Sequence, residues 1–524
     1  MFLRLAILVL VFVPATAIGE NYDTLVVCPP LFQTTLEEWV QYREGQGHKI
    51  LVIDSPSNAD VLKNSIRELA KKYPIKNLVL VGDAKEQGAG LERLTPTAFV
   101  DAKVNVKYGS EPEIATDHIF ADLDDDGIPE LNLGRIPADS SDELRRYLDR
   151  VYEYESKEMN AAWRRRINFV AGVGGFGQLL DKMIEQSVKK IVTDLIPAEF
   201  EVTMTYGSWR SPYCPDPRKF SDTAIGRFNE GCLFWVYIGH GHRRQLDDLR
   251  LPDRRLPILD ERNVGLLNSR SSFPIAILLS CYSAAIDAEK DGLGELMMDQ
   301  PNGPIATISS SRVSMPYGMG VFSLEILDQY FEGDAASLGE LVRTAKQRLV
   351  EFNPEKSEYH HLLHSMAQSF SPDADLLVEE RKEHVHLMHL LGDPLLRIQR
   401  PDRLELDVPL EIQKGDTVVV KGTARNSGQL TVDLTYRRDR FRNRPPRRKK
   451  YLPTNSEFDS YQNVYLQTQN LNCVSKTLPV KAGPFQIKLK IPNDCSGDCH
   501  IRGLLQSDSD LAIGSKDVTI KSYP

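Results

Sequence analysis

A histidine and a cysteine each follow an apolar run, and together they offer the two groups of a thiol-dependent hydrolase. The run 233–238 leads through a glycine to His240, and the run 273–279 leads through a serine to Cys281. Cysteine attacks as the thiolate, and a neighbouring imidazole favours the thiolate and then protonates the leaving amine. The pair predicts cleavage of peptide bonds through a thioester acyl-enzyme, with protein or peptide substrates and no cofactor in the chemistry.

Two backbone amides beside these side chains are suited to bind an oxyanion. Gly241 follows the histidine and has no side chain to hinder its N–H group, and the N–H of Cys281 is the natural second donor. Losing one such donor costs about 3–4 kcal/mol of transition-state stabilisation. Gly241 and Cys281 are therefore the predicted oxyanion hole.

Each motif alone also has a simpler interpretation. A cysteine after an apolar strand is commonly an inert core thiol, and Gly-His-Gly is commonly a bend. Catalysis requires the two runs to be neighbouring parallel strands, because ligands bind beyond the carboxyl ends of such strands. The alternative function is a catalytically inactive, secreted binding protein that retains the fold.

Alternating apolar and amphipathic segments predict the sheet that would carry these residues. Expected strands lie at 24–27, 49–53, 77–81, 167–172, 202–206, 233–238, 275–280 and 305–309. Expected helices lie at 36–46, 59–72, 144–155, 179–195, 222–229, 293–299, 320–331 and 338–352. Near-continuous apolar strands that alternate with helices are typical of a parallel sheet covered on both faces.

The composition changes after Pro401, where short β-rich segments are separated by turn residues. These lie at 407–423, 429–436, 464–467, 485–491 and 518–521 and predict a small all-β sandwich. A basic tract, 437–450, interrupts them and is either a solvated loop or a contact for an anionic surface. The expected organisation is a leader at 1–17, a first α/β unit at 22–158, a second, catalytic α/β unit at 159–400 and the β-rich unit at 403–524.

The N-terminus indicates export. Arg4 precedes the apolar run 5–13, and a small-x-small cleavage site follows at 15–17, which is typical of a secretory signal peptide. The run is too short to span a membrane, and we see no transmembrane segment elsewhere. The net charge of -9 argues against a nucleic-acid partner. We expect an extracellular or periplasmic protein; the sequence indicates no oligomeric state.

Seven cysteines leave at least one thiol unpaired within an exported chain. Three of them, Cys473, Cys495 and Cys499, lie close together near the C-terminus, where a disulfide among them is plausible. The count alone does not indicate which thiol is free.

Two further sets of side chains have the composition of metal ligands. Asp122, Asp124 and Asp126 alternate before Gly127, as in a calcium loop, although Leu133 stands where such a loop has its last carboxylate. We interpret them as a structural Ca²⁺ site or an acidic turn. Six histidines, at 360, 361, 364, 384, 386 and 389, make a zinc-dependent hydrolase a third hypothesis; 384 and 386 would share a strand face.

The motifs, taken in order, resemble the gingipain family of cysteine peptidases over about residues 23–400. The similar segments are 78–83 (Leu-Val-Leu-Val-Gly-Asp), 132–137 (Asn-Leu-Gly-Arg-Ile-Pro), 237–241 (Tyr-Ile-Gly-His-Gly), 280–281 (Ser-Cys), 304–316 and 390–394 (Leu-Leu-Gly-Asp-Pro). The resemblance implies a caspase-like α/β sandwich of two subdomains, followed by an immunoglobulin-like domain. Gingipains also bind calcium, which favours the first interpretation of the acidic loop.

Carried over residue by residue, the resemblance implies that His240 is the catalytic histidine and Cys281 the nucleophile. It implies that the pocket for the side chain before the scissile bond is lined by Ser309, Ser310, Ser311, Arg312 and Met315. One member departs from the family: Val173 stands before a Gly-Gly pair where gingipains carry a glutamate. The preference for arginine or lysine is therefore not transferred.

Overall fold

The computed structural model describes residues 21–84, 91–156, 161–175, 178–270 and 272–522. The predicted signal peptide at 1–17 lies outside the described residues. Among the residues described, no helix combines the length and the apolar character that a membrane-spanning segment needs.

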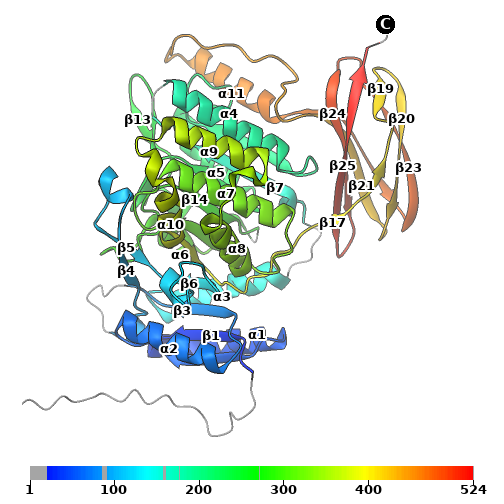
Figure 1. The fold of residues 1–524 in the computed structure, drawn as a ribbon. Coiled ribbons are helices and arrows are strands. Elements are labelled where there is room, and N and C mark those ends of the chain that lie inside the picture. Colours follow the sequence, from blue (N-terminus) through cyan, green and yellow to red (C-terminus); the bar gives the residue numbers. More distant parts are fainter. Residues whose placement is uncertain (1–20, 85–90, 157–160, 176–177, 271, 523–524) are drawn as a thin grey trace, which may run out of the picture.

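A ten-stranded sheet forms the centre of the larger part of the molecule (Figure 1). Its strands, in spatial order, are β2 (Ile50–Asp54), β1 (Thr24–Cys28), β3 (Asn77–Val81), β6 (Asn132–Ile136), β16 (Met388–Leu391), β15 (Ala306–Ser310), β14 (Ile275–Leu279), β9 (Phe234–Ile238), β7 (Arg166–Ala171) and β8 (Glu201–Tyr206). The eight predicted strands are all present, and the predicted α/β class is confirmed.

The sequence predicted a parallel sheet. The observed sheet consists of two parallel halves that meet in one antiparallel pair. β15 and β16 run in opposite directions, whereas β16 pairs with β6, and β14 with β15, in parallel. Parallel neighbours need a crossover connection that returns the chain to the same end of the sheet. Four helices connect β15 to β16, and the chain re-enters the sheet from the other end. The carboxyl ends of β9 and β14 therefore lie on the opposite edge from those of β1, β3 and β6.

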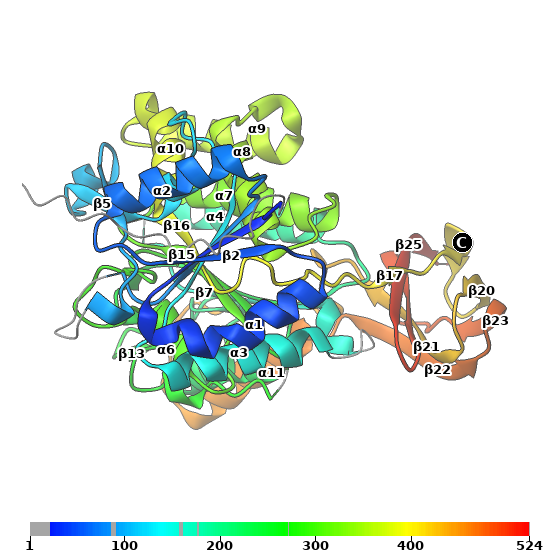
Figure 2. The same cartoon turned by 90° about the horizontal axis from the view of Figure 1, so that it is seen from below.

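Helices cover both faces of this sheet (Figure 2). They are α1 (Gln33–Gly45), α2 (Ala59–Lys72), α3 (Ser141–Ser156), α4 (Gln178–Asp194), α5 (Phe220–Asn229), α6 (Leu293–Asp299), α7 (Pro316–Phe331), α8 (Leu338–Val350), α9 (Glu358–Phe370) and α10 (Leu377–Leu387). Three small hairpins complete this part: β4 (Ala98–Asp101) with β5 (Glu113–Thr116), β10 (Gly241–His242) with β11 (Gln245–Leu246), and β12 (Asp248–Arg250) with β13 (Arg255–Pro257).

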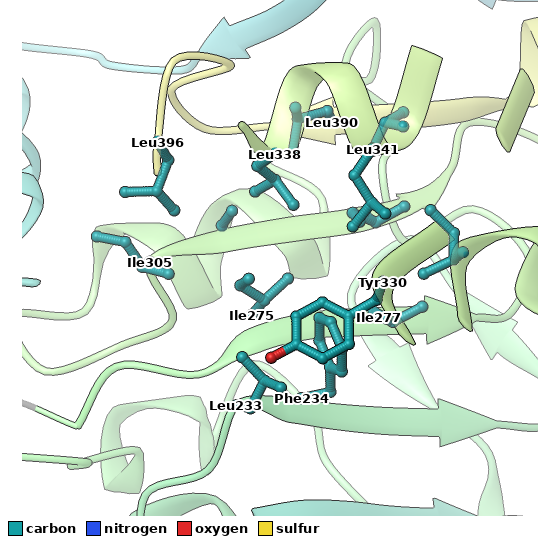
Figure 3. Close-up of a cluster of buried hydrophobic side chains, with 14 of the residues drawn as sticks. Leu233, Phe234, Ile275, Ile277, Ile305, Tyr330, Leu338, Leu341, Leu390 and Leu396 are labelled. Atoms are coloured by element: carbon teal, nitrogen blue, oxygen red, sulfur yellow. The ribbon is translucent and has the colours of Figure 1, made fainter. Parts of the chain in front are cut away.

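The central strands are buried on both faces, and this fixes the position of whatever follows them. In β9, Phe234 belongs to the apolar core on one face, and Trp235 belongs to the core on the other. In β14, Ile275 and Ile277 share the first of these cores with Tyr330 of α7 (Figure 3). Side chains that alternate between two packed cores resist both tilt and register shift.

The C-terminal part is a β-sandwich of two sheets, as predicted; the pairing is antiparallel except for two short strands, 402–403 and 411–413, which pair in parallel with 511–521. One sheet contains β17 (Asp402–Arg403), β25 (Leu511–Lys521), β24 (Gly497–Gln506), β21 (Gly428–Tyr436), β22 (Asn472–Val480) and β19 (Glu411–Gln413). The other contains β18 (Leu406–Asp407), β20 (Thr417–Ala424) and β23 (Gly483–Lys490). A single apolar core fills the space between them.

Two predictions of local structure are wrong. The segment 464–467 is part of helix α11 (Asn455–Gln469), not a strand. Thr454 caps this helix by accepting a hydrogen bond from the Glu457 N–H, and Phe458, Tyr461 and Tyr465 lie on one helical face. The histidines at 384 and 386 lie on α10, so they do not share a strand face.

Candidate active site

His240 and Cys281 lie at equivalent positions beyond two neighbouring parallel strands. β9 pairs with β14, with Ile238 opposite Leu279, so the histidine and the cysteine each stand two residues beyond the last paired residue. The Gly239 N–H donates to the Leu279 carbonyl at 3.2 Å and extends the ladder past the strand ends. The structure therefore brings the two predicted residues to the same edge of the sheet.

Gly241 packs directly against the peptide that carries the cysteine. A Cβ atom at this position would lie 2.7 Å from the Cys281 carbonyl oxygen and 2.8 Å from Ser280 Cβ. Only glycine allows this approach of the two loops. Among the described residues, no loop or turn bond joins the Cys281 N–H to a backbone carbonyl, and this amide favours the ionised form of the residue's own thiol.

The His240 ring is oriented by a backbone carbonyl. Its Nε2 lies 2.6 Å from the oxygen of Gly174, and because a carbonyl only accepts, Nε2 must carry the proton. The neutral imidazole then presents Nδ1 as its basic nitrogen. This carbonyl belongs to the Gly-Gly pair that follows Val173, the position at which the sequence lacks the glutamate of gingipains, and the ring contact is made by a main-chain oxygen.

The Cys281 sulfur lies in a half-buried position. The Ser314 N–H donates to Sγ at 3.3 Å, and the Ser314 carbonyl oxygen lies 3.7 Å from it. Burial raises the pKa of the Cys281 thiol, and the Ser314 amide opposes this rise. The thiolate therefore needs a further positive partner, which an imidazolium supplies.

Glu111 joins the loops that follow the two catalytic candidates and was missed by the sequence analysis. Its carboxylate accepts a hydrogen bond from Tyr282 Oη at 2.8 Å and forms an ion pair with Arg243. Tyr282 follows the cysteine with a φ of 60°, and the Arg243 guanidinium lies 4.8 Å from the centre of its ring. Glu111 belongs to no motif and is distant in sequence, so no local signal marks it.

The predicted pocket residues have two different roles in the structure. Ser309, Ser310 and Ser311 are fully buried at the end of β15, beside β14. Arg312 is 3% exposed and forms a two-pronged ion pair with Asp287, at 2.8 and 2.7 Å, so its charge is already compensated. Met315 is half-buried, and its N–H donates to Nε2 of His384 at 3.0 Å. Of the five residues, only Met315 is open enough to contact a substrate.

An acidic cluster beside the first half-sheet can hold a metal ion. Carboxylate oxygens of Asp122, Asp124 and Glu130 all lie within 4.8 Å of one another. Three carboxylates suit a hard cation such as calcium. Asp126, predicted as a ligand, is outside the cluster and instead accepts from the Ile128 N–H at 2.7 Å. Glu130 replaces it because the loop returns after Gly127, whose φ is 86°.

The six clustered histidines do not form a metal site within the described part of the chain. His360 Nε2 pairs with Glu325 at 2.7 Å, and His389 Nε2 lies 3.2 Å from the Ala115 carbonyl. Burial lowers the pKa of His384 and of His386 to about 4. His361 is exposed, and Nδ1 of His386 is buried without a hydrogen-bond partner. The six side chains therefore do not converge on one ion, which removes the basis for a zinc-dependent hydrolase.

Two curated peptidases are similar to this chain in sequence. Lys-gingipain from Porphyromonas gingivalis is 24% identical over 301 residues, covering 56% of this chain and 16% of the relative. Gingipain R2 from the same species is 22% identical over 315 residues, covering 56% of this chain and 37% of the relative. The matches thus span well under half of the length of these relatives.

The crystal structure of the Arg-specific cysteine proteinase gingipain R shares the fold. It aligns with a TM-score of 0.51 at 15% sequence identity and covers 96% of this chain and 98% of that chain. Peptidase family C25 matches residues 18–399, which contain the whole ten-stranded sheet. The resemblance found in the sequence is therefore confirmed, and the chain belongs to peptidase family C25, the gingipain family of cysteine-type peptidases.

Proposed function

We propose that this chain is a secreted cysteine endopeptidase in which Cys281 is the nucleophile and His240 transfers the protons. The observation that carries the proposal is the parallel pairing of β9 with β14. Because of this pairing, both residues follow their strands at equivalent positions on the same edge of the sheet. The membership of family C25 supports the reaction type.

The proposed reaction assigns each proton transfer and each bond to a named group. Nδ1 of His240 takes the proton of the Cys281 thiol, while Nε2 stays bonded to the Gly174 carbonyl. The thiolate attacks the substrate carbonyl carbon, and the Cys281 and Gly241 N–H groups stabilise the oxyanion. The imidazolium then protonates the leaving amine, and water, deprotonated by the same Nδ1, hydrolyses the thioester.

Three single variants test this proposal. Cys281→Ala should reduce peptide hydrolysis to background, and His240→Ala should reduce kcat about 100- to 10,000-fold, the range of general acid–base catalysis. His242→Ala is the matched control, because this exposed histidine lies two residues further on, and it should retain activity. Equal losses in His240→Ala and His242→Ala would contradict the assignment.

A catalytically inactive binding protein is the second candidate, favoured by the half-buried thiol of Cys281 and by the missing glutamate. Stoichiometric labelling of Cys281 by iodoacetamide in a protein that cleaves no member of a peptide library would support it. Labelling that abolishes a measurable hydrolysis supports the enzyme.

Export and a bound cation complete the proposal. The apolar run 5–13 and the site at 15–17 support removal of a leader, so the mature protein should begin at Ile18 by N-terminal sequencing. Asp122, Asp124 and Glu130 would hold a structural Ca²⁺, which would fix the loop before β6 and take no part in the reaction.

A further inference from the structure

A long segment leaves the C-terminal sandwich and binds the catalytic part of the molecule. This segment, which we call the strap (residues 437–471), connects β21 to β22 and contains α11. Figure 1 shows α11, in orange, on the large sheet unit and away from the strands between which it is inserted. The basic tract predicted as a loop or an anionic contact forms the first part of the strap.

The strap is held to the catalytic part by specific contacts. Arg438 donates to the carbonyls of Pro197 and Phe200, both at 2.7 Å, just beyond α4. The side-chain amide of Gln469 bonds the backbone N–H and carbonyl of Met204, at 3.1 and 2.8 Å, and so covers the free edge of β8. The strap therefore attaches the sandwich to the large sheet. The strength of this attachment depends on the base of the strap, where the chain leaves β21 at Tyr436 and enters β22 at Asn472.

Three cysteines surround the base of the strap. Cys473 Sγ lies 2.7 Å from Cys495 Sγ, and Cys499 Sγ lies 3.8 Å from Cys495 Sγ. Cys473 stands at a β-bulge, since Thr435 is opposite Asn472 while Leu434 is opposite Val474. The bulge leaves Cys473 without a ladder partner and turns it toward the turn that carries Cys495.

This turn and the start of β24 also hold the strap through ion pairs. Arg442 donates to Asp494 at 2.7 Å, and Arg440 donates to Asp498 at 2.6 Å. The two ends of the strap meet where the N–H of Tyr436, the last residue of β21, donates to the Leu471 carbonyl at 3.0 Å. A covalent link at this point would tie the two ends of the strap and the turn 492–496 together.

We infer that Cys473 and Cys495 are a disulfide-forming pair that locks the base of the strap, with Cys499 left as a thiol. The inference draws on the proposed export, because disulfides persist in oxidising compartments. Cys495 lies between the other two sulfurs, and its hydrogen bonds with Cys473 and Cys499 lower the pKa of its thiol; we therefore assign it as the attacking group.

The chemistry is a thiol–disulfide exchange with an external disulfide such as glutathione disulfide. The Cys495 thiolate attacks one sulfur of the oxidant and expels the first glutathione thiolate. Cys473, as its thiolate, then attacks the Cys495 sulfur and expels the second. The two cysteine protons pass to the two glutathione thiolates, and the two electrons lost by the cysteines reduce the oxidant.

Peptide mapping of the full-length protein tests which sulfurs are joined. The protein is treated with glutathione disulfide, free thiols are alkylated, and the chain is cut before aspartate, which separates Cys495 from Cys499 at Asp498. We expect a cross-linked pair of peptides containing Cys473 and Cys495, and an alkylated Cys499. A Cys495–Cys499 link, or three alkylated thiols, overturns the inference, and neither result depends on peptidase activity.

Thermal unfolding and amide exchange test the effect on the strap. Dithiothreitol should lower the melting temperature of oxidised wild type and of Cys499→Ser, and leave the double variant C473S/C499S unchanged. Amides at 437–441 and 470–473 should exchange several-fold faster after reduction. The inferred disulfide is contradicted if dithiothreitol lowers the melting temperature of the double variant as much as that of wild type. It is also contradicted if reduction leaves amide exchange in wild type unchanged. If the double variant does not fold, exchange in wild type alone decides.

Discussion

The Tyr282 hydroxyl donates to the Glu111 carboxylate at 2.8 Å, which ties the residue after Cys281 to the N-terminal part of the chain. The Tyr282 backbone is left-handed, a conformation that costs about 1–2 kcal/mol in a non-glycine residue. The same carboxylate pairs with Arg243, three residues after His240. One side chain thus restrains the loops of both catalytic candidates.

We predict that Glu111→Gln lowers kcat about 10-fold with little change in KM, because misplacement of the thiol by a fraction of an ångström is costly. Tyr282→Phe should lower kcat by a similar factor. The double variant should lower kcat by less than the product of the two single factors, because the two side chains act through one hydrogen bond. Steady-state kinetics on a peptide substrate measure both. Glu113→Gln, on an exposed side chain of β5, is the control and should retain activity. Additive losses would show that the two residues act separately.

The second prediction concerns the pH dependence of Cys281 alkylation. Burial raises the pKa of this thiol, so without a positive partner the thiolate forms only above the ordinary value of about 8.5. In His240→Ala, the iodoacetamide rate should therefore keep rising with pH beyond that value. In wild type the imidazolium stabilises the thiolate, and the rate should reach its plateau at a lower pH. Superimposable pH profiles would mean that the two groups do not interact.

The position of the candidate site was predictable because it depends on local patterns and one general rule. The apolar runs before His240 and Cys281 identify two central strands, and parallel neighbours put their carboxyl ends at one edge. β6 and β16 were not predicted. β6 contains a glycine and an arginine, and β16 follows α10 without a loop, so neither has an uninterrupted apolar pattern.

The remaining parts of the site depend on contacts between distant segments. Glu111 approaches Tyr282 across 171 positions, and the Gly174 carbonyl approaches His240 across 66. A backbone carbonyl can replace a glutamate without any mark in the sequence, because every residue has one. The strap was predicted as a loop and a strand because its apolar residues contact the catalytic part, which only the tertiary fold reveals.

The third prediction concerns the buried pair of Arg135 and Asp117. Nε and Nη2 of Arg135 each donate to the carboxylate at 2.7 Å, and this holds the pKa of Asp117 well below its usual range. Its contribution to stability is therefore complete above the unfolded pKa of about 3.9 and is lost as the pH falls toward the folded value. Asp117→Asn leaves a buried guanidinium uncompensated and should cost about 3–5 kcal/mol at neutral pH.

Urea unfolding of Asp117→Asn beside wild type measures this loss. The control is Glu37→Gln, on the exposed face of α1, which should unfold with wild type. The difference between wild type and Asp117→Asn should shrink as the pH is lowered below about 4. A difference that is small at neutral pH, or independent of pH, would contradict a stabilising role for the pair.

The fourth prediction distinguishes the ligand set indicated by the sequence from the ligand set found in the structure. Asp122, Asp124 and Glu130 form the cluster in the structure, whereas the spacing in the sequence indicated Asp126. Binding of Ca²⁺ to the folded state raises the melting temperature by mass action. We therefore expect calcium to stabilise wild type and Asp126→Asn alike, and to have little effect on Asp122→Asn or Glu130→Gln. Burial raises the pKa of Asp122 and Glu130, so the stabilisation should weaken on mild acidification. If Asp126→Asn loses the response while Glu130→Gln keeps it, the ion is held by the alternating loop and not by the cluster.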